Sequence, residues 1–119
     1  MNIYESGEMY LENILEIRQK NGSVRSVDLV NTMGFAKSSV SEGIKNLKNN
    51  GYVEVSKDGL ITLTEKGEEV AKHIFEKHTI LTKAFVSLGV EPEIAEKDAC
   101  KIEHIISDET FNAIKKHVK

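Results

Sequence analysis

The sequence predicts a mainly α-helical fold that carries one small β-hairpin. Apolar residues recur at intervals of three and four along most of the 119-residue chain, which is the period of a helix with one buried face. The period changes only over residues 52–55 and 60–63, which are rich in β-branched and aromatic side chains and flank the turn sequence Ser56-Lys57-Asp58-Gly59. Two such runs around a turn are typical of a hairpin.

Three helices are expected before the hairpin, over residues 5–20, 27–33 and about 38–50. Asn21-Gly22 ends the first helix, because both residues tolerate the positive φ of a helix C-terminus. Ser26 is expected to cap the second helix, and Gly34 ends that helix. Gly51 ends the third.

Three more helices are expected after the hairpin, over about 65–88, from Pro92 to about residue 106, and from Ser107 toward His117. Thr64 is expected to cap the first of them, and Pro92 suits a first helical turn, where its missing N–H costs no hydrogen bond. Three helices followed by a hairpin is the order of a winged helix-turn-helix. We therefore expect that unit over residues 1–64 and a helical region over 65–119, which is too short for an independent core and should dimerise.

The composition is that of an ordinary globular chain and argues against several classes of protein. Hydrophobic residues make 39% and charged residues 29%, which is evidence against long disorder. A single cysteine excludes an intramolecular disulfide and is typical of the reducing cytoplasm. No run approaches the roughly 18 apolar residues of a membrane span, and the first residues lack the pattern of a signal peptide. The net charge of −3 argues against a purely electrostatic nucleic-acid binder.

The third predicted helix is a candidate for reading operator DNA. In a helix-turn-helix the second helix of the motif enters the major groove, and its first turn contacts base edges. Its hydroxyl groups, one carboxylate and its lysines, with a lysine at the hairpin tip, are candidates for contacts with bases and phosphates. These candidates are Lys37, Ser38, Ser39, Ser41, Glu42, Lys45, Lys48 and Lys57. The plain alternative is a solvated helix face, on which serine and lysine are common.

A second group of residues indicates a metal site. Glu96, Cys100, Glu103 and His104 are spaced i, i+4, i+7 and i+8, so a helix would place all four on one face. First-row divalent metals accept such mixed carboxylate, thiolate and imidazole ligands. Further candidates outside this run are Met9 and Glu12 on the first helix and His78 on the long helix. Each of these residues taken alone is more often an ordinary packing or surface residue.

Five short runs carry a resemblance to a known family. They are Glu8-Met9-Tyr10-Leu11, Ser38-Ser39-Val40-Ser41, Leu63-Thr64-Glu65-Lys66-Gly67, Asp98-Ala99-Cys100-Lys101-Ile102-Glu103-His104 and Ser107-Asp108-Glu109. With the order of the elements, they resemble the iron-dependent repressor family, the metal-dependent transcriptional repressors typified by the diphtheria toxin repressor and the manganese transport regulator. The likeness covers nearly the whole chain, and the Cys-x-x-Glu-His run is its most specific part.

The resemblance implies a homodimer that binds operator DNA when a metal occupies a site between the DNA-binding and helical regions. Met9, Cys100, Glu103 and His104 match the primary site of the iron-responsive branch. His78 matches an accessory-site ligand of both branches, and Glu12 matches a ligand of the manganese branch.

Two positions depart from the iron-responsive branch, because Thr82 and Glu96 stand where its accessory site has an acidic residue and a histidine. Occupancy of a second metal site is therefore open. The thioether of Met9 and the thiolate of Cys100 favour Fe(II), with Mn(II) the alternative because manganese prefers oxygen-rich sites.

Other functions remain open on the sequence alone. A winged-helix repressor that senses an organic ligand, independently of metal, would share the fold but leaves the Cys100-Glu103-His104 run unexplained. A metalloenzyme is disfavoured, since the chain has no His-Glu-x-x-His motif, P-loop or nucleophile elbow. A module whose winged helix binds protein is the third alternative.

Overall fold

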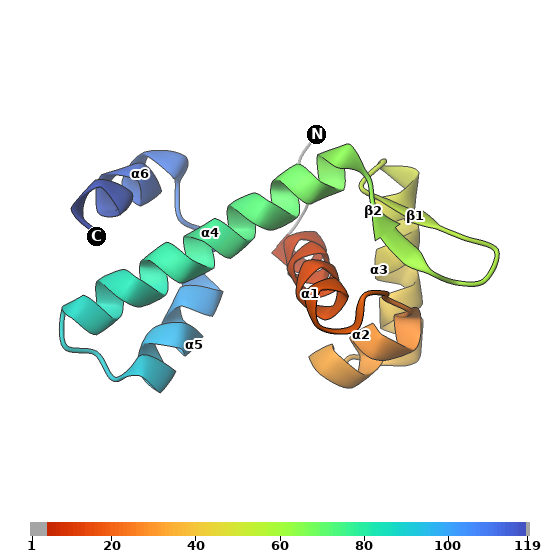
Figure 1. Cartoon of the computed structure of the whole chain (residues 1–119), viewed down its shortest axis with the longest axis horizontal. Helices are drawn as coiled ribbons and strands as arrows, with labels where there is room; N and C mark the ends of the chain where they lie inside the picture. Colours follow the sequence, from red (N-terminus) through yellow and green to blue (C-terminus); the bar gives the residue numbers. More distant parts are fainter. Residues whose placement is uncertain (1–4, 119) are drawn as a thin grey trace. The chain divides into compact units, whose positions relative to one another are not determined.

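The computed structural model describes residues 5–118 and confirms the mainly helical fold with one hairpin (Figure 1). The elements in chain order are α1 (Glu5–Asn21), α2 (Ser26–Met33), α3 (Lys37–Asn49), β1 (Val53–Val55), β2 (Ile61–Leu63), α4 (Glu65–Ser87), α5 (Pro92–Ile102) and α6 (Asp108–His117). The chain divides into two compact units, one ending at Lys72 and the other beginning at His73. No helix within the described range is long and apolar enough to cross a membrane.

The first unit is a winged helix-turn-helix with its own apolar core. Leu11 and Ile14 of α1 and Leu29 of α2 are fully buried, and the apolar face of α3 joins them through Val40 and Ile44. The period of three and four residues predicted this face, because those side chains point to one side of each helix. The core therefore fixes which side of α3 is left for solvent.

The hairpin follows the three helices and pairs in antiparallel register. Val53 lies opposite Leu63, and Val55 lies opposite Ile61, whose backbone N–H also donates to the Val24 carbonyl at 2.8 Å. The turn between the strands exposes Lys57. This arrangement is the wing that the sequence predicts.

Thr64 and Gly67 fix the start of α4 against the turn that precedes β1. The Thr64 hydroxyl accepts from the Gly67 N–H at 3.1 Å and donates to the Gly51 carbonyl at 2.6 Å, so it caps the helix as predicted. A Cβ at Gly67 would overlap the carbonyl oxygen of Tyr52. The Thr-Glu-Lys-Gly run therefore serves the close approach of α4 to the wing.

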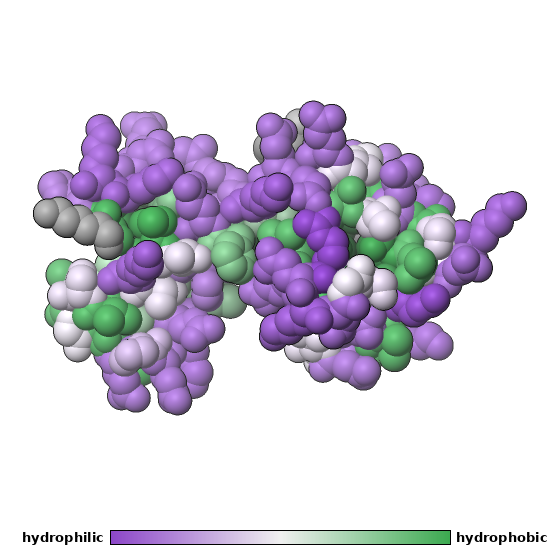
Figure 2. Space-filling view, in the orientation of Figure 1, coloured by the Kyte–Doolittle hydropathy of each residue, from purple (hydrophilic) through white to green (hydrophobic). Residues whose placement is uncertain are grey.

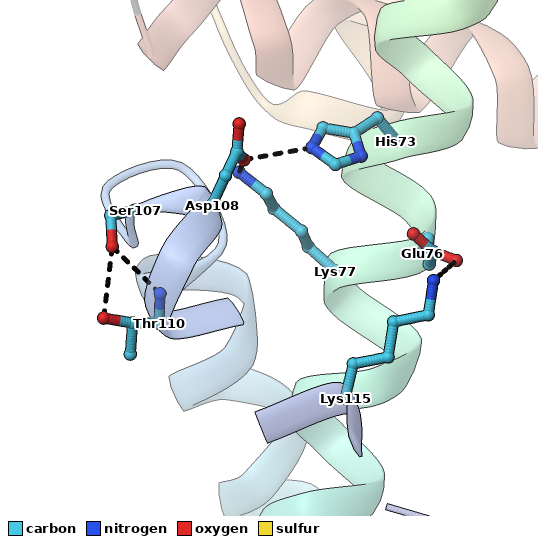
Figure 3. Close-up of polar contacts among 7 residues, drawn as sticks. All are labelled: His73, Glu76, Lys77, Ser107, Asp108, Thr110 and Lys115. Carbon is cyan, nitrogen blue, oxygen red and sulfur yellow. Dashed lines mark hydrogen bonds and ion pairs between the residues drawn. The ribbon is translucent and has the colours of Figure 1, made fainter. Parts of the chain in front are cut away.

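In the second unit, two sets of ion pairs hold α6 to α4 (Figure 3). The Asp108 carboxylate lies 3.3 Å from both Nε2 of His73 and Nζ of the buried Lys77. The His73 hydrogen bond, followed by that of Lys77, holds the pKa of Asp108 below its ordinary value. Farther along α6, the Lys115 ammonium donates to Glu76 at 2.8 Å. Apolar residues also reach the surface of this unit near the α4–α5 connection, where Leu88 is exposed (Figure 2).

Two local predictions are wrong. The N-cap of α2 is Arg25 rather than Ser26, because the Asp28 carboxylate accepts from the Arg25 N–H at 2.8 Å and satisfies the helix end from within. The helix that begins at Pro92 ends at Ile102 instead of continuing to about residue 106. The Ile102 carbonyl accepts from the N–H groups of residues 105 and 106 at 3.0 and 2.9 Å, which closes a turn there.

Candidate metal centre and nucleic-acid interface

The structure places all the predicted DNA-contacting residues on exposed surface. Lys37, Ser38, Ser39, Ser41, Glu42, Lys45 and Lys48 lie on α3, and Lys57 lies in the turn of the wing. The opposite side of α3 is buried through Val40, Ile44 and Leu47, which fixes the polar side outward. A helix so oriented can present side chains to base edges in a groove.

Asn46 is a further candidate on the same exposed side of α3. It is exposed and lies one helical turn beyond Glu42. Asparagine can donate to and accept from an adenine edge at once, which makes it a suitable base-reading group. The i+4 spacing from Glu42 is the signal by which the sequence could have identified it.

In the second unit, Glu103 lies between two imidazoles. Its Oε2 is 2.9 Å from Nδ1 of His78 on α4, and its Oε1 is 3.3 Å from Nε2 of His104. Glu103 is fully buried, and the His104 side chain is 1% exposed. Glu96 of α5 extends the cluster, with its Oε1 3.9 Å from Nε2 of His78.

The end of α5 positions this cluster. Glu103 and His104 occupy the turn directly after Ile102 rather than the last turns of a longer helix. From that turn the Glu103 carboxylate contacts His78 of α4, and the His104 ring contacts Glu103. The helical spacing predicted all four residues on one helix, but Glu103 and His104 lie beyond its last residue.

The remaining predicted ligands are placed as follows. Cys100 is an exposed residue of α5, one turn after Glu96 and one turn before Glu103. Met9, half-buried, and Glu12, buried, lie three residues apart on α1 and belong to the first unit. Thr82 follows His78 by one turn of α4, and its hydroxyl donates to the His78 carbonyl at 2.7 Å.

The donor set of the second unit fits a divalent transition metal. Neutral imidazole nitrogens and carboxylate oxygens are ligands that manganese, iron and zinc all accept. Burying a carboxylate is unfavourable unless positive charge compensates it, and either a metal ion or a protonated imidazole can supply that charge beside Glu103. The cluster is therefore suited to hold a cation.

A winged helix-turn-helix joined to a helical unit with such a cluster defines a metal-responsive DNA-binding regulator. Comparison with known proteins makes the assignment specific. Residues 2–60 match the profile of the iron-dependent repressor N-terminal DNA-binding domain, and residues 64–119 match that of the iron-dependent repressor metal-binding and dimerisation domain. The chain belongs to the iron-dependent repressor family.

Individual relatives agree with this assignment. An HTH-type transcriptional regulator of Methanocaldococcus jannaschii is 38% identical over 113 residues, which is 93% of this chain and 90% of the relative. The transcriptional regulator MntR of Escherichia coli O6:H1 is 34% identical over 106 residues, or 89% of this chain and 68% of MntR. The family assignment favours metal sensing over the alternative of an organic ligand.

Solved structures share the fold. A manganese-dependent transcriptional repressor in complex with manganese superimposes with a TM-score of 0.86 at 26% identity, covering 93% of this chain. The metal-dependent transcriptional regulator MtsR gives a TM-score of 0.83, also at 26% identity. This chain spans about half the length of either structure, 51% and 52% respectively.

Proposed function

We propose that the chain is a metal-activated repressor that binds operator DNA as a homodimer and controls genes of metal homeostasis. The observation that carries the proposal is the buried Glu103 carboxylate held between His78 and His104, in a chain whose first unit exposes the polar face of α3. The matches to the DNA-binding domain and to the metal-binding and dimerisation domain of the iron-dependent repressors support it. The proposal gives the cluster a regulatory role and no catalytic one.

In this proposal, residues of both units serve as ligands. His78, Glu103 and His104 form the buried part of the site, Glu96 lies at its exposed side, and the exposed Cys100 of α5 is a further proposed ligand. The family resemblance adds Met9 and Glu12 of α1 as further proposed ligands. The bound metal supplies positive charge and fixes the directions of its ligands.

Ligands drawn from two units provide a reason for metal control of DNA binding. A metal that binds only one arrangement of the units shifts the population toward that arrangement, by an amount set by its differential affinity. If that arrangement is the one that binds operator DNA, the metal is a corepressor. Activation by a metal matters for a chain of net charge −3, because its own electrostatic attraction to DNA is weak.

We infer that Fe(II) and Mn(II) are both candidates for the activating metal. The sulfur atoms of Met9 and Cys100 favour Fe(II), while the oxygen ligands Glu12, Glu96 and Glu103 suit Mn(II). Relatives named for manganese support the second choice. The double change Met9→Asp with Cys100→Glu should raise activation by Mn(II) relative to Fe(II) under anaerobic conditions. Lys101→Glu, which adds a carboxylate at the adjacent exposed position, is the control and should not change the preference.

DNA selection tests the proposed function. A random-sequence duplex library is passed over purified protein with Mn(II) or, anaerobically, Fe(II), and the enriched duplex is titrated with and without EDTA. We expect tight binding that EDTA abolishes, loss of metal-dependent binding in His104→Ala, and its retention in His117→Ala, a change of an exposed histidine on α6. Enrichment of one sequence without any metal would contradict the proposal.

A further inference from the structure

Tyr10 of α1 makes a specific contact with the first turns of α3. Its side chain is 5% exposed, and its hydroxyl donates to the Ser39 carbonyl at 3.2 Å. Phe35, in the turn before α3, packs edge-on against the Tyr10 ring at 6.1 Å between centroids.

Gly43 provides the space for this tyrosine. It lies in the middle of the 13-residue helix α3, where glycine is a poor helix former and needs another reason to be present. A Cβ at Gly43 would overlap Cε2 and Cζ of the Tyr10 ring. Glycine at this position therefore lets α1 and α3 approach more closely than any other residue allows.

The contact is made at the turn of α3 that the proposed function assigns to base reading. Ser39 and Gly43 are four residues apart, so the Ser39 carbonyl and Gly43 lie next to each other along α3, and the end of the Tyr10 side chain meets both. Ser38, Ser39 and Glu42 line a shallow depression together with Tyr10. A change in the contact between this turn and Tyr10 would therefore displace the side chains of α3 that are proposed to face DNA.

We propose that Tyr10 is the positioning residue of the reading helix. Its ring against Gly43 and its hydroxyl on the Ser39 carbonyl set the distance between α1 and the first turns of α3. That distance determines how well the protein discriminates between operator DNA and other DNA. This inference rests on the proposed function. It assigns Tyr10 no contact with DNA. Base contacts require placement to within a fraction of an ångström, whereas phosphate contacts by flexible lysines tolerate displacement.

The test compares binding to two DNAs with metal at saturation. One is the duplex that the unaltered protein selects from a random-sequence library with Mn(II), and the other is a scrambled duplex of the same length. Tyr10→Phe keeps the ring and loses the hydroxyl, and it should lower the ratio of the two affinities by about threefold to tenfold, the equivalent of one hydrogen bond. Affinity for the scrambled duplex should stay within about twofold, because phosphate contacts carry it.

A second pair of variants tests the ring. Gly43→Ala should lower the same ratio more than Tyr10→Phe does, because the methyl group displaces the buried ring as well as its hydroxyl. In a Tyr10→Leu background, which removes the overlapping ring atoms, adding Gly43→Ala should have little further effect. Asn49→Ala, a change at the exposed last residue of α3, is the control and should leave the ratio unchanged. Urea unfolding of each variant separates loss of fold from loss of placement.

The outcomes separate this inference from the proposed function. If the unaltered protein selects no duplex, the proposed function fails and the inference with it. If it selects one, and Tyr10→Phe and Gly43→Ala both keep the full affinity ratio, the inference alone is overturned. Equal losses of affinity for both duplexes would also overturn it, because they would show a general loss of fold or charge rather than of placement.

Discussion

Replacing Glu103 by glutamine should separate metal binding from the stability of the metal-free fold. The two oxygens of Glu103 lie 2.9 Å from His78 and 3.3 Å from His104, and the side chain is fully buried. Glutamine keeps the shape but removes the charge. In the metal-free protein, the substitution loses the two charge-assisted contacts of the carboxylate, worth about 1.5–3 kcal/mol each. It also removes the penalty of several kcal/mol for burying that charge, which offsets the loss. The free energy of unfolding should therefore change by less than about 2 kcal/mol in either direction.

Metal-induced stabilisation should fall much more clearly. Losing even an outer-shell partner of a metal ligand typically weakens metal binding by about 10- to 100-fold. A loss of that size removes about 1.4–2.7 kcal/mol of the stabilisation that saturating metal provides. Urea unfolding in EDTA and in excess Mn(II) measures both quantities on the same protein. Glu109→Gln, at an exposed position of α6, is the matched control and should retain the full metal effect. The same stabilisation by Mn(II) in Glu103→Gln and in the unaltered protein would refute the assignment of Glu103 as a ligand.

Three further predictions concern the scaffold and the DNA interface. Gly67→Ala should destabilise the protein by about 1–3 kcal/mol in urea unfolding, because the added methyl group meets a main-chain carbonyl that cannot move freely. This loss is expected although alanine is the better helix former, and a gain in stability would contradict the close approach. The pKa of Asp108 lies below its ordinary value through His73 and a buried lysine, so its stabilisation is complete above about pH 4 and is lost as the pH falls further. Asp108→Asn should accordingly flatten the fall of unfolding free energy in acid, and an unchanged pH profile would exclude this pairing in solution. Lys48→Ala should weaken binding to all DNA and lower the salt dependence by about one phosphate contact, whereas Glu42→Gln should change base preference. Equal effects of the two substitutions on specificity would contradict the assignment.

The helices of the first unit could be predicted from the sequence because their signals are local. The apolar period and the glycines predicted α3 over about 38–50, and the structure has Lys37–Asn49. The cap of α2 was assigned to the wrong residue for an instructive reason. Serine is a common N-cap, but Asp28 satisfies the Arg25 N–H from the third helical position, and that choice depends on a side-chain conformation.

The members of the candidate metal cluster could be identified from the sequence, but their geometry could not. Ile102, Ile105 and Ile106 continue a helical period across the true end of α5, so the pattern alone could not show that Glu103 lies in a turn. The contact between Tyr10 and Gly43 was equally invisible, since it joins positions 33 apart in the chain and depends on an absent side chain. Long-range packing decides both features, and a single sequence records it only indirectly.

Reciprocal coupling between metal and DNA tests the central claim most directly. Mn(II) is titrated into the protein alone and into the protein saturated with its selected duplex, and the duplex is titrated with and without Mn(II). If the metal activates DNA binding by favouring one arrangement, each ligand must tighten the other by the same factor, which typical coupling energies place at about 5- to 150-fold. Equal affinity for Mn(II) with and without the duplex would show that the metal site does not control DNA binding.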